Sequence, residues 1–330
     1  MKRAMVTGGC GFLGSSIVRL LLERGVEVSV LALPNEPTDN LAGLDVEIQR
    51  GNVLDLEACR RAVGGVDTLF HAAAIYKSFM LDPRPMYEVN LRGTFNMLEA
   101  ARRAEVERTI YTASIVSLGR PAPGRLGDES SAYEAWDVEM HYSRSKYHSR
   151  EVAEGFAAWG MDVRVVCPGA VLGPGDIAPT PTGQTVINTL QTPGPAVTTD
   201  GGMSYVDVRD AALVHILAAE KGRAGERYIA TAHNLSNADL MRAIMKASGD
   251  TRSIRRLPTG LTKRLVRGME RIALLRGKEP PVTSAFFEYT LKPGFYSNQK
   301  SVLELGATYR DFGETLSDAI AYFRERGLLR

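Results

Sequence analysis

Short apolar runs alternate with longer amphipathic stretches along the first half of the chain. The runs are rich in valine, isoleucine and threonine, and they span residues 3–8, 26–33, 45–52, 66–74, 108–114 and 161–169. Most of the stretches between them have roughly 10 to 20 residues with apolar side chains at helical spacing, for example residues 87–104. Alternating strands and helices predict an α/β protein with a doubly wound parallel sheet that helices cover on both faces.

The regular alternation breaks after Cys167. Residues 168–183 are dense in proline and glycine, as expected of a loop that leaves the carboxyl end of a strand. A further helix and strand then return to the same sheet, and a mainly helical tail begins at Ser236. We therefore expect two interleaved lobes, a sheet lobe from residues 1–172 and 201–232 and a smaller, mainly helical lobe from residues 173–200 and 233–330.

Composition limits the class of protein. The chain has 330 residues, of which 44% are hydrophobic and 24% charged, so it can bury a large core. A formal net charge of +2 gives no reason to expect a nucleic-acid partner, which leaves a small molecule as the expected ligand. The early glycines and the lack of a long apolar run leave no signal peptide or membrane span, which predicts a cytoplasmic protein.

The three cysteines carry no recognisable pattern. Cys10, Cys59 and Cys167 are far apart in the sequence and lack CxxC spacing. We expect small buried side chains, with neither a disulfide framework nor a metal site.

The first predicted strand ends in a glycine-rich turn. The stretch VTGGCGFLG places Gly8, Gly11 and Gly14 directly before a predicted helix, with Phe12 and Leu13 inside the turn. Backbone amides at such a helix start can bind the pyrophosphate of a dinucleotide, and a side chain there would block the phosphates. A tight turn without a ligand is the alternative, but the flanking strand and helix favour a nucleotide site.

Tyr142 precedes Lys146 by one helical turn. Free tyrosine titrates near pH ~10, so a nearby ammonium is expected to lower the pKa of the phenol. Ser114 ends a predicted strand, where its hydroxyl can donate a hydrogen bond to a substrate oxygen. Tyrosine and lysine could share a helical face by chance, but together with Ser114 and the glycine turn they predict a catalytic acid/base.

These features resemble the extended short-chain dehydrogenases/reductases, and the resemblance covers essentially the whole chain. The turn has the GxxGxxG spacing of that family, and Ser114, Tyr142 and Lys146 match its catalytic triad. Further matches are GNVLD, HAAA, VNLRGTFN and CPGAVLGPGD. The stretches GDIAPTPTGQ, YVDVRDAA and YSNQKSVLELG are most similar to the branch of dihydroflavonol 4-reductase-like proteins and hopanoid-associated sugar epimerases.

The resemblance implies a Rossmann-type dinucleotide-binding lobe, a substrate-binding second lobe, and a homodimer formed through residues 87–104 and the helix that carries Tyr142. It also implies that Lys146 holds the nicotinamide ribose. The residues that it assigns to the cofactor are Gly8, Gly11, Phe12, Leu13, Gly14, Leu33, Asn52, Val53, His71, Ala72, Ala73, Asn90, Tyr142, Lys146, Pro168, Gly169 and Val171. Asn52 departs from the family, which more often has an aspartate there.

The end of the second predicted strand bears on the choice between NAD and NADP. Ala32 and Leu33 stand where an acid would bind the ribose 2′-hydroxyl of NAD, and no arginine stands there to pair a 2′-phosphate. Because a phosphate without a partner costs more than a hydroxyl without one, the sequence favours NAD, with Glu36 as a substitute acid.

Residues outside the triad indicate the reaction. Ile115 and Val116 stand where the related 4,6-dehydratases carry the acidic pair that eliminates water, so dehydration is not expected. Gly201, Gly202 and Met203 stand where nucleotide-sugar epimerases commonly carry an arginine for a diphosphate. The sequence therefore predicts reversible reduction of a ketone or aldehyde to an alcohol. Epimerisation through a transient keto intermediate is the alternative, and a non-catalytic nucleotide sensor is a remote one.

Aromatic residues flank the two motifs of the predicted site. Tyr76 and Lys77 follow the HAAA stretch and Tyr133 precedes the catalytic tyrosine, so with Ser114 they are candidates for the substrate pocket. Packing is the alternative role for each of them.

Residues 261–278 predict a basic amphipathic helix, with Leu261, Leu265, Met269 and Ile272 at helical spacing. The basic side chains between them include Lys263, Arg264, Arg267, Arg271 and Arg276. Such a helix is expected to turn its apolar side to the core and its basic side to solvent. The alternative is contact with an anionic membrane surface, which would suit a lipid-like substrate.

Overall fold

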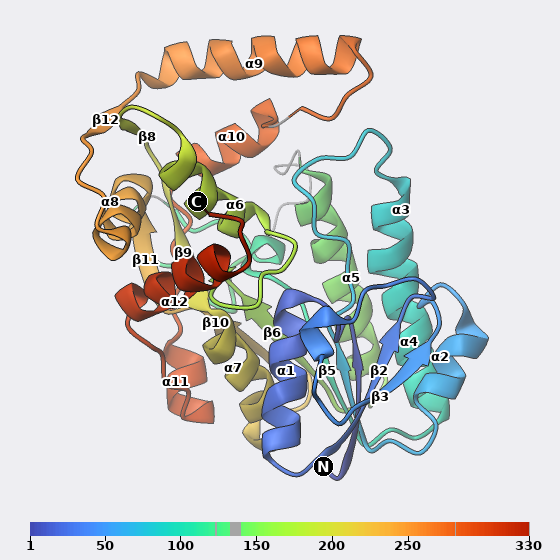
Figure 1. Ribbon diagram of the computed structural model, residues 1–330. Coiled ribbons are helices and arrows are strands. Elements are labelled where there is room, and N and C mark those ends of the chain that lie inside the picture. Colours follow the sequence, from blue (N-terminus) through green and yellow to red (C-terminus); the bar gives the residue numbers. More distant parts are fainter. Residues whose placement is uncertain (123, 133–139, 281, 330) are drawn as a thin grey trace.

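The computed structural model describes residues 1–122, 124–132, 140–280 and 282–329. Within this part of the chain, seven parallel strands form a central sheet in the order β3-β2-β1-β4-β5-β6-β10 (Figure 1). The strands are β1 (Arg3–Thr7), β2 (Glu27–Ala32), β3 (Glu47–Arg50), β4 (Thr68–His71), β5 (Arg108–Thr112), β6 (Val163–Pro168) and β10 (Arg227–Ala230). All six predicted apolar runs form strands of this sheet, which confirms the doubly wound α/β fold.

Different helices cover the two faces of the sheet, because successive side chains of a strand point to opposite faces. In β1, Ala4 and Val6 belong to the core formed with α1 and α7, whereas Met5 packs on the other face with α2 and α4. Helix α5 lies beside α4 on that second face. These helices are α1 (Phe12–Glu23), α2 (Leu56–Ala62), α4 (Thr94–Arg103), α5 (His141–Ala158) and α7 (Val208–Lys221).

The helix predicted over residues 87–104 begins earlier and is not uniform. It starts as α3 (Arg84–Tyr87), passes through a π-helical turn over Glu88–Gly93 and continues as α4. The apolar periodicity does not reveal the turn. The buried Asn90 lies within this turn, and its side chain hydrogen-bonds to a distant loop.

The second lobe packs around its own core, to which Leu172, Val186, Tyr205, Ile244 and Leu316 contribute. Strands β11, β9 and β7 form a small mixed sheet, and β12 pairs with β8. Residues 170–172 and 202–207, expected in the sheet lobe, thus pair outside the central sheet. The elements are β7 (Ala170–Leu172), α6 (Pro181–Gln191), β8 (Ala196–Thr198), β9 (Gly202–Asp207), β11 (His233–Ser236), α8 (Asn237–Ser248), β12 (Ile254–Arg256), α9 (Thr259–Leu275), α10 (Ser284–Leu291), α11 (Gln299–Leu305) and α12 (Phe312–Glu325).

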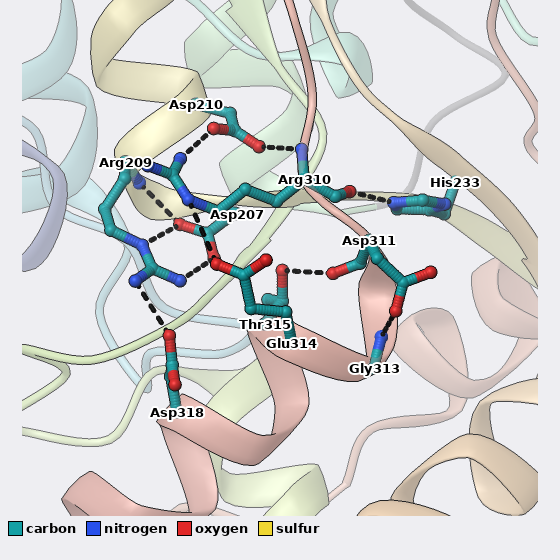
Figure 2. Close-up of polar contacts among 10 residues, drawn as sticks. All are labelled: Asp207, Arg209, Asp210, His233, Arg310, Asp311, Gly313, Glu314, Thr315 and Asp318. Atoms are coloured by element: carbon teal, nitrogen blue, oxygen red, sulfur yellow. Dashed lines mark hydrogen bonds and ion pairs between the residues drawn. The ribbon is translucent and has the colours of Figure 1, made fainter.

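Ion pairs join α12 to the start of α7 (Figure 2). The Asp207 carboxylate caps α7 by accepting from the backbone amide of Arg209 at 2.8 Å and from its guanidinium at 2.9 and 2.7 Å. The same guanidinium pairs with Asp318 of α12 at 2.7 Å. Burial would raise the pKa of Asp207, but the bonds from Arg209 outweigh it and hold the pKa below its ordinary value.

A second pair lies beside the first (Figure 2). Asp210 accepts from the backbone amide of Arg310 at 2.7 Å and pairs with its guanidinium. The Arg310 carbonyl accepts from Nε2 of His233 in β11 at 2.8 Å. Helix α7 of the sheet lobe is therefore bound to α12 and to Arg310, just before α12, at one place in the structure. We call this place the lobe junction.

Helix α9 contradicts the expectation that its apolar side faces the core. Leu261, Leu265, Met269 and Ile272 are all exposed, and Val266 is its one buried residue. The helix lies at the outer edge of the second lobe, far from the central sheet (Figure 1). Across the described residues, no helix is both long and apolar enough to cross a membrane.

Candidate active site

A cavity of about 470 Å³ opens at the carboxyl edge of the central sheet. The strand order reverses between β1 and β4 at this edge, which is where doubly wound folds bind ligands. Residues of both lobes line it. The predicted site residues among them are Gly8, Gly11, Phe12, Leu13, Gly14, Leu33, Asn52, Val53, Ala72, Ala73, Tyr76, Ser114, Tyr142, Lys146, Pro168, Gly169 and Val171.

The glycine turn forms one end of the cavity, where there is no room for side chains. Gly8 has a φ of +70°, and a Cβ on it would lie 2.8 Å from the backbone nitrogen of Ala73. A Cβ on Gly14 would lie 2.0 Å from the Gly8 carbonyl oxygen. Gly11 is the N-cap of α1, and no side chain caps the first amides of that helix. These amides are free to bind phosphate oxygens, so the turn fits a dinucleotide pyrophosphate.

Leu33 and Glu36 line the end of the cavity expected to hold the adenosine. The Glu36 carboxylate accepts from the backbone amide of Leu33 at 2.9 Å. Arg50 donates through Nη1 to the carbonyl oxygens of both residues, each at 2.9 Å. No sequence motif marks Arg50, because it reaches this place only through the register of β2 and β3, in which it lies opposite Ala32.

His71 lies behind the cavity lining rather than in it. Its Nδ1 is 2.7 Å from Thr7 Oγ1, and its Nε2 is 3.0 Å from Thr94 Oγ1. Because the Thr94 hydroxyl donates to the Asn90 carbonyl, it accepts from Nε2, which therefore carries the proton. Burial, reinforced by the charge of Lys146, lowers the pKa of His71 to about 3, so the ring is neutral.

Asn90 also lies behind the lining, where it fixes the loop after β4. Its Oδ1 accepts from the Ile75 amide at 2.8 Å, and its Nδ2 donates to the Ile75 carbonyl at 3.2 Å and to Ser145 Oγ at 2.9 Å. The π-helical turn therefore ties this loop to α5, the helix that carries Tyr142 and Lys146.

Ser114, Tyr142 and Lys146 meet at the cavity from different elements. Ser114 follows β5, while Tyr142 and Lys146 lie in the first turns of α5. The Ser114 hydroxyl lies close enough to the Tyr142 phenol to affect its pKa. Burial raises the pKa of Tyr142 well above its ordinary value, the neighbouring Tyr76 and Tyr111 raise it further, and the Ser114 hydroxyl opposes the rise.

Lys146 is buried, and its ammonium donates to the Thr112 carbonyl at 2.7 Å. Burial lowers the pKa of Lys146 to about 8. The sequence predicted that Lys146 lowers the pKa of Tyr142, but the effect of burial on the phenol dominates and its pKa is raised. The phenol is held in the protonated form, which is the form that can donate a proton.

Thr112 connects Lys146 to a second buried histidine that the sequence analysis did not identify. The Nδ1 of His215 donates to the Ala211 carbonyl at 2.7 Å, so Nε2 is the acceptor for the Thr112 hydroxyl at 3.0 Å. Burial lowers the pKa of His215 to about 4, which keeps it neutral. No motif marks Thr112 or His215, because α7 and β5 meet only in the fold.

The substrate candidates fall into three groups. The ring of Tyr76 lies 4.7 Å from that of Tyr142, and its hydroxyl lies close enough to Thr182 of α6 for Thr182 to lower its pKa. Lys77 is exposed and does not line the cavity. Tyr133 lies outside the described residues.

Charge is sparse in the lining. Among the described lining residues, Glu36 and Lys146 are the charged ones, and Glu36 lies at the adenosine end. The end near Tyr142 is lined by apolar and hydroxyl side chains, among them Ile75, Val116, Thr180, Thr182 and Met203. This end suits an uncharged, partly apolar compound.

Hydride transfer to a carbonyl needs a dinucleotide held in place and a proton donor beside it. One sheet edge offers both, since the glycine turn and the Ser114, Tyr142 and Lys146 side chains line a single cavity. This combination defines an oxidoreductase of the extended short-chain dehydrogenase/reductase class. Residues 4–230 match the NAD dependent epimerase/dehydratase family, and the chain belongs to that family.

Three similar proteins extend over almost the whole chain. A Synechocystis sp. protein provisionally named dihydroflavonol 4-reductase is 32% identical over 329 residues, which cover 98% of this chain and 95% of the relative. Sterol demethylase protein B of Methylococcus capsulatus is 30% identical over 341 residues, with 98% and 99% covered. The crystal structure of gox2253 superposes with a TM-score of 0.89 at 34% identity and covers 100% of both chains.

Proposed function

We propose that the protein is an NAD-dependent reductase that reversibly converts a ketone or aldehyde to the alcohol. The observation that carries the proposal is the meeting of Ser114, Tyr142 and the buried Lys146 at an end of the cavity where the described lining has no acidic side chain. The names of two relatives, a dihydroflavonol 4-reductase and a sterol demethylase protein, both refer to uncharged ring compounds.

Nicotinamide, when bound, supplies the hydride for the carbonyl carbon. Tyr142 donates a proton to the carbonyl oxygen and recovers it when the reaction runs toward oxidation. The Ser114 hydroxyl donates a hydrogen bond to the same oxygen and shares the negative charge that develops there. Lys146 holds the nicotinamide ribose, and in its ammonium form it stabilises the phenolate left after proton transfer.

The preference for NAD rests on Glu36. Its carboxylate lines the adenosine end of the cavity and can accept hydrogen bonds from ribose hydroxyls, whereas it would repel a 2′-phosphate. Arg50 donates through Nη1 to the carbonyl oxygens of Leu33 and Glu36, and its charge lies next to the Glu36 backbone. We therefore expect NADH to bind more tightly than NADPH.

An NAD-dependent sugar epimerase is the second candidate, because the family name includes this activity. An epimerase regenerates its cofactor in each turnover and tends to retain it, whereas a reductase exchanges it. Mass spectrometry of the nucleotide released by denaturing the purified protein separates the two. Near-stoichiometric retained NAD would overturn the reductase assignment, and an empty protein that binds NADH reversibly supports it. A protein that binds nucleotide but turns nothing over would be the remote third case, a nucleotide sensor.

The assembly and compartment are also part of this proposal. Phe95 of α4 and Trp159 at the end of α5 are 46% and 72% exposed, and both rings pack on Phe156. Pairing α4 and α5 with those of a second copy would cover them, so we infer a homodimer, which gel filtration tests.

The cysteines are free and buried, as the sequence predicted, which suits a reducing cytoplasm.

A further inference from the structure

The polar side of α9, not its apolar side, holds the helix to the protein. Lys263 and Arg267 pair with Glu288 of α10 at 3.6 and 3.0 Å. Glu270 accepts from the backbone amide of Ser284 at 3.0 Å and from its hydroxyl. Helix α9 lies along the outer side of α10, at the edge of the molecule (Figure 1). The charged side therefore faces inward, which reverses the usual orientation of a surface helix.

The opposite side of α9 is an apolar stripe open to solvent. At 100° per residue, its five side chains fall within about 120° of the helix circumference. They are Leu261, Leu265, Met269, Ile272 and Leu275, which are 56, 56, 46, 52 and 88% exposed. Single exposed leucines are ordinary, but a continuous stripe of this kind marks a surface that something covers.

Basic side chains flank the stripe. Residues 259–278 hold six lysines or arginines and one acid, in a chain whose formal net charge is only +2. In the part of the chain that the structure describes, no ion pair joins Arg264, Arg271 or Arg276 to a carboxylate. Arg264 and Arg271 are thus free cations along one edge of the stripe, and Arg276 is a free cation at its carboxyl end. These charges complement an anionic partner.

We propose that α9 is a membrane-surface helix, with its apolar stripe inserted into the interface of an anionic bilayer and Arg264, Arg271 and Arg276 on the headgroup phosphates. A bilayer offers an apolar interior to the stripe and anionic headgroups to the arginines beside it. A second copy of the chain would cover the stripe but bring two rows of arginines together, which like-charge repulsion opposes.

The position of α9 connects this surface to the cavity. Helix α9 packs on α10, and α10 packs on β9, whose Met203 lines the cavity. Docking would bring the substrate end of the cavity close to the bilayer, which suits a lipophilic carbonyl compound drawn from the membrane. This last consequence rests on the proposed function, whereas the docking itself does not.

Co-sedimentation with vesicles tests the docking. At low salt we expect the protein to pellet with phosphatidylglycerol/phosphatidylcholine vesicles and at least about tenfold more weakly with phosphatidylcholine alone. Leu265→Asp with Ile272→Asp should weaken partition at least about tenfold, and Arg264→Gln with Arg271→Gln to a similar degree. Leu303→Asp is the matched control, because Leu303 is 72% exposed on α11, and it should bind as the wild type does.

Three results would overturn the proposal: no pelleting of the wild type at low salt, equal pelleting of wild type and the double aspartate variant, or a stripe-dependent dimer in sedimentation velocity without vesicle binding. The altered side chains are exposed, so NADH affinity and melting temperature should stay unchanged and serve as the check on folding. Turnover of a water-soluble ketone without vesicles should also be unchanged in the variants. Absence of turnover in all proteins would count against the proposed function and leave the docking result standing.

Discussion

The ring of Tyr76 packs against that of Tyr142, with centroids 4.7 Å apart and planes tilted by 46°. Tyr76 belongs to the loop that Asn90 fixes, and it lines the cavity together with Thr182 of the second lobe, close enough for Thr182 to affect its pKa. The ring of the proton donor is therefore positioned by a residue that contacts both lobes. A change in the second lobe can reach the reacting group through this pair.

Tyr142→Phe should remove turnover and leave nucleotide binding almost intact. Loss of the proton donor is expected to lower kcat by about 10²- to 10⁴-fold, while the dissociation constant for NADH stays within a few-fold. Steady-state kinetics and fluorescence titration measure the two quantities. Tyr76→Phe is the control, because it keeps the ring contact and loses only the hydroxyl in the cavity near Thr182, so KM should rise with little change in kcat. Unchanged kcat in Tyr142→Phe would remove the catalytic assignment.

The pKa of about 8 for Lys146 predicts the pH profile of the reduction. Below this pH the side chain is an ammonium that can stabilise the phenolate formed when Tyr142 gives up its proton. As pH rises through about 8 that charge is lost, so kcat/KM for ketone reduction should fall. Initial rates between pH 6 and 10 check this. A value of kcat/KM that climbs between pH 8 and 9 contradicts the assigned role.

Glu36→Gln should weaken NADH binding and spare NADPH. Removing the carboxylate charge removes an acceptor for the ribose hydroxyls and the repulsion of a 2′-phosphate, so the NADH/NADPH affinity ratio should drop about three- to tenfold. Isothermal titration with each cofactor measures it. Glu27→Gln, at an exposed site in β2, is the control. Tighter binding of NADPH than NADH by the wild type would overturn the preference for NAD.

Gly14→Ala should disrupt the glycine turn, because the added Cβ would lie 2.0 Å from the Gly8 carbonyl oxygen. Since backbone must move to relieve this contact, we expect NADH affinity to fall at least about tenfold and stability to drop by about 1–3 kcal/mol. Gly155→Ala is the matched control in α5, since its Cβ would meet nothing within 4 Å. That variant should bind NADH normally and be up to about 1 kcal/mol more stable. Normal NADH binding by Gly14→Ala would contradict the assigned phosphate site.

Arg310→Met should destabilise the lobe junction. It leaves Asp210, which is 3% exposed, buried without its cation, at a cost of about 2–4 kcal/mol in the free energy of unfolding at pH 7. Burial already raises the pKa of Asp210, so the deficit should shrink as the pH falls and the carboxyl takes up a proton. Arg242→Met, in an exposed pair with Asp239, should cost no more than about 1 kcal/mol. Equal losses of unfolding free energy for the two variants in urea denaturation would show that the Asp210–Arg310 pair stabilises the fold no more than an exposed pair does.

The glycine turn and the triad could be predicted because each depends on short stretches of sequence with strict local requirements. The spacing of Gly8, Gly11 and Gly14 predicts a turn without side chains, and the spacing of Tyr142 and Lys146 places them on one helical face. The central sheet followed from alternating apolar runs for the same reason. Each of these features follows from a local sequence pattern, so it can be recognised without knowledge of tertiary contacts.

What the sequence did not reveal depends on contacts between distant residues. Arg50 reaches the adenosine end through strand register, and Thr112 joins Lys146 to His215 across the packing of α7 on β5. Burial reversed the expected pKa shift of Tyr142, and burial is a property of the whole fold. The amphipathic pattern of α9 was recognised, but periodicity does not determine which side of a helix meets the protein.

The interleaving of the two lobes has a consequence for synthesis on the ribosome. β6 has β5 on one side and β10 on the other, and β10 is made only after the segment that contributes β7, α6 and β9. Until residues 227–230 emerge, the long strand β6 is the unpaired edge of the nascent sheet and is open to other strands. The segment made just before β10 supplies Val171, Thr180 and Met203 to the cavity. Completion of the site and pairing of β6 therefore belong to a single late stage of folding.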